Sequence, residues 1–230
     1  MKTMETLSRG DDLIASYSAK GPTAIDHIAK PDLVAPGNLV VSTIGPGAHT
    51  LSTLYPQNVV AGGYFRLSGT SMAAPVVSGA AALLLEQNSK LSPDQVKARL
   101  MRTATKNFPS ASFATDPVSG ARYASAYDFL TVGAGYLDIL AALNSPDLAA
   151  RQSLSPAVVY DATAGTVSMV ADSSVIWGSS VIWGSSVIWG SSVVWADATP
   201  TGQSVIWGSS VVWADTFTGG GERTSVLGEK

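Results

Sequence analysis

Apolar positions in the first part of the chain occur in short runs separated by glycine and proline. Within residues 1–67, the runs 32–37 and 39–44 are each long enough for one short strand. Pro36 and Gly37 are typical turn residues, and they stand at the junction of the two runs. The pattern predicts a buried strand, a turn and a second strand, in this order.

The pattern becomes helical between residues 68 and 143. Residues 73–87 are rich in alanine and leucine and are apolar on nearly every side, which is typical of a buried helix. We expect Pro75 in the first turn of this helix, where its missing N–H costs little. A short helix is also expected over residues 136–143, after a glycine-rich step.

The helix between these two has a clear start signal. Ser92 is a favourable N-cap residue, Pro93 suits the first helical position, and Gln95 completes a capping box with Ser92. The signal predicts a helix that begins after Ser92 and runs to about Thr103.

A third pattern follows residue 145, where a six-residue unit with the sequence SSVIWG repeats. The units fill residues 173–196, resume over 203–214, and contain all six tryptophans of the chain. An even period places alternate residues on one face of a strand, so each unit predicts a short strand with Gly-Ser-Ser turns. We therefore expect a domain at residues 1–145 and a β-rich tail at residues 146–230.

Three interpretations of the repeat are open. The units could pack on one another with the tryptophans as a core, in the manner of a β-solenoid. They could instead present an exposed aromatic surface that binds a glycan, a cell surface or a partner chain. Finally, they could be poorly ordered alone, in which case their high β-propensity and low charge would favour aggregation.

Composition narrows the function classes. Charged residues make up only 13% of the 230 residues, and the net charge is −3 without a basic block, which argues against nucleic acid or an anionic membrane as partner. There is no cysteine, so disulfides and cysteine-ligated metals are excluded. The longest apolar stretch, 73–85, is too short and interrupted to span a bilayer, and residues 1–5 do not resemble a secretory signal.

The segment 69–75, with the sequence GTSMAAP, concentrates the candidate chemistry. A serine hydroxyl is a poor nucleophile unless its surroundings activate it. Gly69 and Thr70 are expected to form a tight turn, which places Ser71 at the start of the apolar helix. Backbone N–H groups at a helix N-terminus carry positive partial charge, which favours the oxyanion that develops during acyl transfer.

Residues 69–83 resemble the serine-box helix of subtilisin-like peptidases, and segments 14–23, 30–37, 91–97 and 133–138 resemble the flanking segments of that family. The resemblance covers about residues 11–143. It implies an α/β fold with a parallel sheet and a serine endopeptidase that cleaves polypeptides through an acyl-enzyme on Ser71. The Ser71 N–H would contribute to the oxyanion hole. The resemblance also implies an extracellular or cell-surface location. No cofactor is expected; calcium is compatible with the family, but no calcium or other metal site is identifiable.

The other parts of the family's catalytic machinery are not recognisable. The triad aspartate and histidine precede the serine in this family, but residues 1–70 contain neither an Asp-Ser/Thr-Gly nor a His-Gly-Thr step. Asn38 and Asn58 do not match the family's oxyanion asparagine. We expect the C-terminal half of a catalytic domain that is inactive alone. The alternative is a non-catalytic surface-binding or structural module that acts through its tryptophan repeat.

The chain contains two histidines that are candidates for the missing general base. His27 or His49 could in principle activate Ser71, with Asp26 orienting the ring. The resemblance places both histidines in segments that do not supply the triad, so we expect two loop histidines without a catalytic role.

Three further aspartates could be mistaken for functional groups. Asp32 lies in the segment 30–37 and is expected to be a structural residue at a strand entry rather than the triad acid. Asp11 and Asp12 could bind a metal, but we expect them in a solvated loop.

Overall fold

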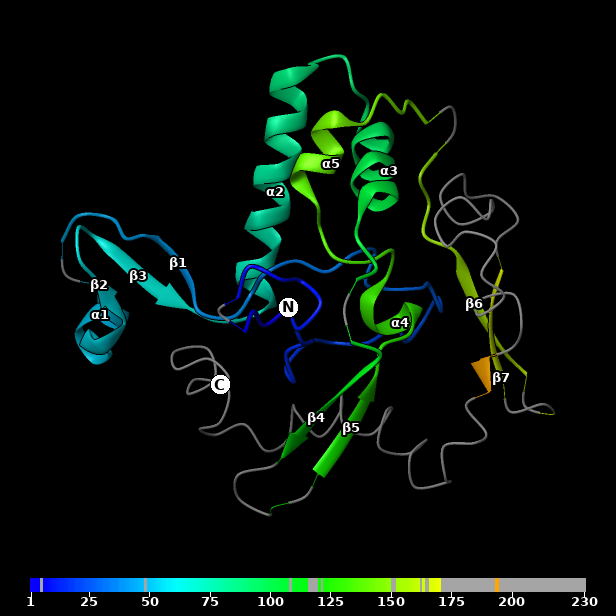
Figure 1. Ribbon diagram of the computed structural model, residues 1–230, viewed down its shortest axis with the longest axis horizontal. Coiled ribbons are helices and arrows are strands. Elements are labelled where there is room, and N and C mark those ends of the chain that lie inside the picture. Colours follow the sequence, from blue (N-terminus) through cyan, green and yellow to red (C-terminus); the bar gives the residue numbers. More distant parts are fainter. Residues whose placement is uncertain are drawn as a thin grey trace.

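The computed structural model describes residues 1–4, 6–47, 49–107, 109–115, 120, 122–149, 152–161, 163, 166–170 and 193–194. Three helices form its centre, and they are packed side by side: α2 (Thr70–Gln87), α3 (Pro93–Thr103) and α5 (Ile139–Asn144) (Figure 1). Apart from the two-residue strand β8 (Val193–Val194), the predicted hexad repeats lie outside the described residues. None of the described helices is long and apolar enough to cross a membrane.

One apolar cluster holds the three helices together. It joins the buried Ala80 and Leu84 of α2 to side chains from α3 and α5, from the residues just before these two helices, and from the segment before β1: Ala35, Leu91, Val96, Leu100, Leu137 and Ala142. Only one face of α2 takes part in this cluster.

The start of α3 confirms the capping box. The Ser92 hydroxyl accepts a hydrogen bond from the backbone N–H of Gln95 (3.3 Å), and the Gln95 side chain accepts one from the Ser92 N–H (3.0 Å). The helix ends at Thr103, as its sequence predicts. The predicted third helix begins three residues later than expected, at Ile139, because the Asp138 side chain caps it by accepting from the Ala141 N–H (2.9 Å).

Two expectations about α2 are wrong. The helix begins at Thr70, before the alanine- and leucine-rich stretch 73–87, so Pro75 lies inside the helix and not in its first turn. Ala80 and Leu84 are its only buried residues, whereas Leu83 and Leu85 are 42% and 41% exposed. An apolar helix buries only the face that other elements cover, and the described elements cover one face of α2.

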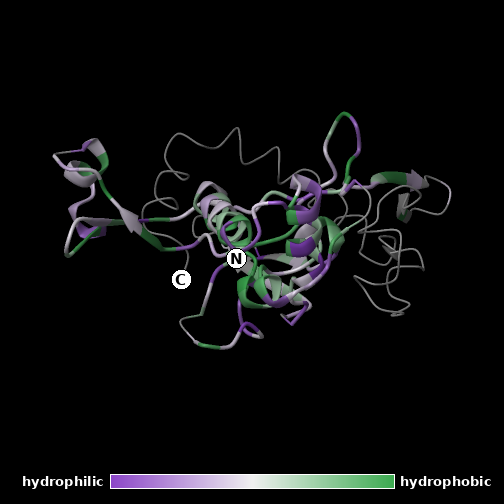
Figure 2. Ribbon diagram, turned by 90° about the horizontal axis from the view of Figure 1, so that it is seen from above, coloured by the Kyte–Doolittle hydropathy of each residue, from purple (hydrophilic) through white to green (hydrophobic). Residues whose placement is uncertain are grey.

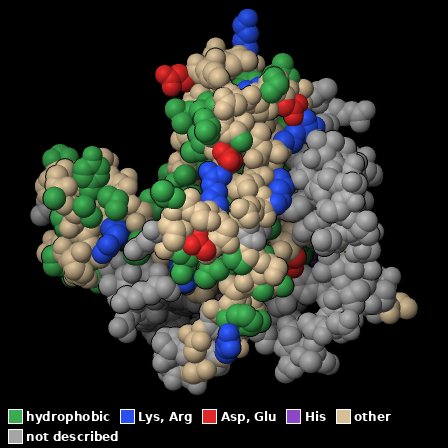
Figure 3. Space-filling model, viewed as in Figure 1, with side chains coloured by type: hydrophobic (Ala, Val, Ile, Leu, Met, Phe, Trp, Pro, Cys, Tyr) green, Lys and Arg blue, Asp and Glu red, His purple; other side chains and the backbone are tan. Residues whose placement is uncertain are grey.

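An arm projects from the base of α2. It contains β1 (Val40–Thr43), α1 (Thr50–Leu54), the 3-10 turn η1 (Pro56–Asn58), β2 (Val59–Val60) and β3 (Tyr64–Leu67). Its sheet has the order β1-β3-β2, and both strand pairs are antiparallel. Apolar side chains are exposed on the arm (Figure 3): Val41, Leu51, Leu54, Val59, Val60 and Tyr64.

Two more antiparallel hairpins complete the described structure. β4 (Ala111–Thr115) pairs with β5 (Arg122–Ala126) ahead of α4 (Phe129–Val132). β6 (Ala157–Asp161) pairs with β7 (Thr166–Val170), which also pairs with β8. Seen from above, the arm and the β6–β7 hairpin extend to opposite sides of the helices (Figure 2).

The described strands do not confirm the parallel sheet that the resemblance implies. Every pairing between described strands is antiparallel, and the one parallel pairing is the isolated bridge between Val34 and Tyr136. The second predicted strand corresponds to β1, whereas the first, residues 32–37, contributes only this bridge. The structure therefore combines helices and strands, and the parallel sheet stays a prediction.

The chain continues to pack against the domain beyond residue 145. Ala149, Val158 and Val167 are buried in one cluster with Met101 and Phe129. The division of the chain at residues 145 and 146 remains a prediction, and the core includes side chains from both sides of it.

Candidate active site

Ser71 is the second residue of α2, and the turn before it is held by backbone hydrogen bonds. Gly69 is the N-cap with φ 148°, a conformation that favours glycine. The Gly69 N–H donates to the Gly37 carbonyl (2.8 Å), and the Gly69 carbonyl accepts from the Met72 N–H (3.0 Å). The sequence GTS thus turns the chain at Gly69 and places Ser71, which is exposed, at the first turn of the helix.

The loop at residues 37–39 supports this turn, a contribution that the sequence did not identify. A Cβ atom on Gly37 would lie 2.9 Å from the Gly69 carbonyl oxygen, so only glycine fits the approach without a shift. The buried Ser68 hydroxyl accepts from the Leu39 N–H (2.8 Å), and the Tyr17 hydroxyl donates to the Gly37 carbonyl (2.9 Å). The Pro36-Gly37 turn signal was the only pointer to this loop.

The first N–H groups of α2 are available to an acceptor. The N–H groups of Thr70 and Ser71 make no backbone hydrogen bond among the described residues. The 18-residue helix adds its N-terminal positive partial charge at this point. The arrangement can stabilise an oxyanion that forms next to the Ser71 hydroxyl.

Neither histidine is brought to Ser71, and both lie outside helices and strands, as the sequence predicts. The His27 carbonyl accepts from the Val158 N–H (2.7 Å), so this residue lies beside β6. His49 is the N-cap of α1 in the arm, and its Nε2 is 2.8 Å from the Gly45 carbonyl oxygen. Among the described residues, neither imidazole makes a hydrogen bond with Ser71.

Asp32 is bound into a network that links separate segments. Its carboxylate pairs with the ammonium groups of Lys30 (2.5 Å) and Lys97 on α3 (3.1 Å), and it accepts from the Ser155 hydroxyl. Burial alone would raise the pKa of Asp32, but the hydrogen bonds from Lys30 and Ser155 and the charge of Lys97 lower it below its ordinary value. These contacts support the structural interpretation of this residue.

The expectation of a solvated loop is wrong for Asp12. Its side chain is only 3% exposed and accepts from the Met4 N–H (3.4 Å). Burial raises the pKa of Tyr136, and the charge of Asp12 beside it raises this pKa further. Asp11 is partly exposed and accepts from the Thr6 hydroxyl (2.9 Å). No cluster of three potential metal ligands occurs in the part of the chain that the structure describes.

Comparisons with known proteins agree with the serine-box geometry. The sequence model described as "Subtilase family" matches residues 6–120, half of the chain. The chain therefore belongs to the subtilase family.

Individual relatives match part of this chain and a small part of their own length. The serine protease AprX of Bacillus subtilis is 43% identical over 100 residues, which cover 44% of this chain and 22% of AprX. The subtilisin-like protease SBT1.3 of Arabidopsis thaliana is 36% identical over 151 residues, 65% of this chain and 17% of that protein. Fervidolysin from Fervidobacterium pennivorans, a keratinolytic enzyme related to subtilisin, matches with a TM-score of 0.37 and 27% identity, over 60% of this chain and 20% of that structure. The chain thus spans about a fifth of the length of these relatives.

Proposed function

We propose that this chain is the C-terminal part of the catalytic domain of a subtilisin-like serine endopeptidase, with Ser71 as its nucleophile. The observation that carries this proposal is the position of Ser71: exposed, second in an 18-residue helix, and beside N–H groups without backbone acceptors in the described structure. Gly69 and Thr70 form the supporting turn. The similarity to serine proteases supports a polypeptide substrate.

In this proposal, Ser71 performs the acyl-transfer step. Its Oγ attacks the scissile carbonyl carbon, and the hydroxyl proton passes to a histidine outside this chain. The carbonyl oxygen becomes an oxyanion that the Ser71 N–H helps to hold. The C–N bond then breaks, the amine leaves with the proton from the histidine, and the acyl group stays on Ser71. None of these steps needs a cofactor.

The proposal includes a longer protein that supplies the aspartate, the histidine and the parallel sheet. Its support is that the chain spans about a fifth of AprX and SBT1.3, while His27 lies beside β6 and His49 lies in the arm. The 230-residue chain alone is then expected to have little or no peptidase activity. An extracellular or cell-surface location is part of the same proposal.

A fluorophosphonate probe tests the nucleophile, because covalent labelling requires an activated serine. The longer gene product should be labelled at Ser71, the Ser71→Ala variant should not, and the isolated chain should give no labelling and no casein hydrolysis. Ser78→Ala is the matched control, because Ser78 lies on the same helix and, among the described residues, its exposed hydroxyl donates only to the Ala74 carbonyl (3.2 Å).

Two results would contradict the proposal in different ways. Labelling of the isolated chain that Ser71→Ala alone abolishes would mean that a base is present within these residues. A longer product that cleaves casein but is labelled elsewhere would exclude Ser71 as the nucleophile.

A further inference from the structure

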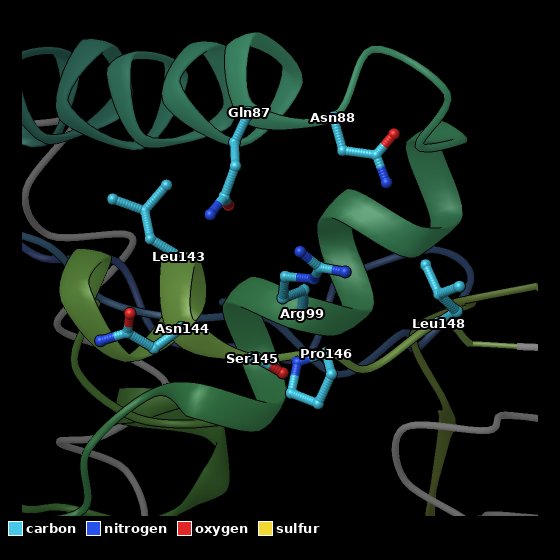
Figure 4. Close-up of a pocket in the computed structure, with 8 residues that line it drawn as sticks. All are labelled: Gln87, Asn88, Arg99, Leu143, Asn144, Ser145, Pro146 and Leu148. Carbon is cyan, nitrogen blue, oxygen red and sulfur yellow. The ribbon is translucent and has the colours of Figure 1, made fainter.

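A pocket of about 350 Å³ lies away from Ser71, at the opposite end of α2, where α2 ends beside α3 and the end of α5 (Figure 4). Its volume is at the lower end of the range of about 300–1,000 Å³ that is typical of ligand sites. Arg99 of α3 lies at its centre, with Gln87 and Asn88 on one side and Ser145 on the other. The proposed peptidase chemistry makes no use of this pocket.

Arg99 is a buried cation that has no acidic partner among the residues that the structure describes. The residue is only 5% exposed, and its Nε and Nη2 both donate to the same acceptor, the backbone carbonyl of Asp147 (3.2 and 2.8 Å). Its Nη1 makes no hydrogen bond with any residue that the structure describes. The Asp147 carboxylate is not available to it, because that group is paired with Arg102. A buried charge normally requires a partner of opposite sign.

The other groups around the pocket fit a compact anion of single charge. Among the described residues Arg99 is the only charged one that lines the pocket, and the side-chain amides of Gln87, Asn88 and Asn144 can donate further hydrogen bonds. The carbonyl ends of α2 and α5 carry negative partial charge at this position, so they repel a doubly charged phosphate about twice as strongly as a singly charged anion. A carboxylate has the single charge and the planar, two-oxygen geometry that a guanidinium edge recognises.

We propose that this pocket binds a carboxylate through Nη1 of Arg99. The group could belong to a small free acid or to the C-terminus of a peptide, because the pocket is open on the side of the exposed Gln87, Asn88 and Asn144. Leu143 and Leu148 supply apolar contacts for the carbon atoms next to the carboxylate.

The experiment follows the Arg99 Nε–H resonance of the ¹⁵N-arginine-labelled full chain during separate titrations. The ligands are acetate, a short apolar peptide with a free C-terminus, and the same peptide as its C-terminal amide. A saturable shift with acetate and the free peptide indicates a general carboxylate site, and a shift with the free peptide alone indicates a site for peptide C-termini. No saturable shift with either, or equal shifts with the amide or with chloride, would overturn the proposal.

Variants distinguish binding in the pocket from a general attraction between the charges of the protein and the ligand. Arg99→Met should weaken binding at least about tenfold, as expected for a lost charge-assisted hydrogen bond. Because Arg99 also holds the Asp147 carbonyl, Gln87→Leu is the second variant: it leaves the guanidinium in place and should weaken binding by a smaller factor. Lys90→Met removes an exposed charge outside the pocket lining, and it should leave the affinity unchanged. Binding that survives both pocket substitutions would contradict the proposal.

Discussion

Helices α2 and α3 lie side by side, yet the sequence described one of them far better than the other. The start of α3 depends on hydrogen bonds between Ser92 and Gln95, which are three residues apart, and the structure shows both bonds. The burial of α2 depends on segments far away in the chain, and the predicted burial on all sides is wrong. A local capping signal therefore predicts the start of a helix more safely than an all-round apolar composition predicts its burial.

The largest expected effect tests the one-sided burial of α2. Leu84 is fully buried in the helical cluster, so Leu84→Ala should lower the free energy of unfolding by about 2–5 kcal/mol through lost contacts and a cavity. The neighbouring Leu83 is 42% exposed, and Leu83→Ala should cost less than about 1 kcal/mol. Urea denaturation measures both values. Equal losses would mean that both faces of α2 are covered.

A second substitution tests how the start of α2 is held. Gly37→Ala places a Cβ atom 2.9 Å from the Gly69 carbonyl oxygen and 3.1 Å from the Ala73 Cβ, which should cost about 1–3 kcal/mol of stability. The control is Gly79→Ala within α2, where the added Cβ atom meets no other part of the structure within 4 Å. This variant should stabilise the protein by about 0.5–1 kcal/mol, because alanine has a higher helix propensity than glycine. Thermal unfolding compares the pair, and a neutral Gly37→Ala would argue against the close approach.

The capping box of α3 should have a smaller effect. Ser92→Ala removes the hydroxyl that accepts from the Gln95 N–H, at an expected cost of about 1 kcal/mol. Ser92→Gly should cost only a few tenths of a kcal/mol, because glycine is tolerated at the N-cap. Chemical denaturation checks the order of the two variants. If alanine is no worse than glycine, the hydrogen bond does not stabilise α3.

The smallest effect concerns the ion pair between Lys97 of α3 and Asp32. Among the described residues, α2 has no such ion pair. The folded pKa of Asp32 is lowered, so its contribution is present above the unfolded pKa of about 4 and is lost as the pH falls through the folded value. The pKa of Asp138 is also lowered and adds in the same direction, whereas the raised pKa of Asp128 acts in the opposite one.

The measurement for Asp32 is the stability of the wild type and of Asp32→Asn between neutral pH and pH 2. The loss of stability on acidification should be shallower in the variant, because the variant has no carboxylate to protonate at this position. Parallel pH profiles would show that the network around Asp32 does not favour the charged form.

The extent of successful prediction differs between the fold and the site. The helix at 93–103, the strand within 39–44 and the family were predictable, because each rests on neighbouring residues or on a long motif. The support of Gly69 by Gly37 and the burial of Asp12 beside Tyr136 were not, since these contacts join residues far apart in sequence.

What the sequence determined by itself is local: the cap of α3, and the segment that places Ser71 after the Gly69 turn. The cap depends on side-chain-to-backbone bonds between residues three apart, and the Met72 N–H closes the turn locally on the Gly69 carbonyl, so the residue types are sufficient for both. Only the tertiary structure decided which face of α2 is buried, which cations hold Asp32, and why Arg99 has no acidic partner in the described structure. Burial and charge pairing depend on the neighbours that folding brings together, and the order of residues along the chain does not specify these neighbours one by one.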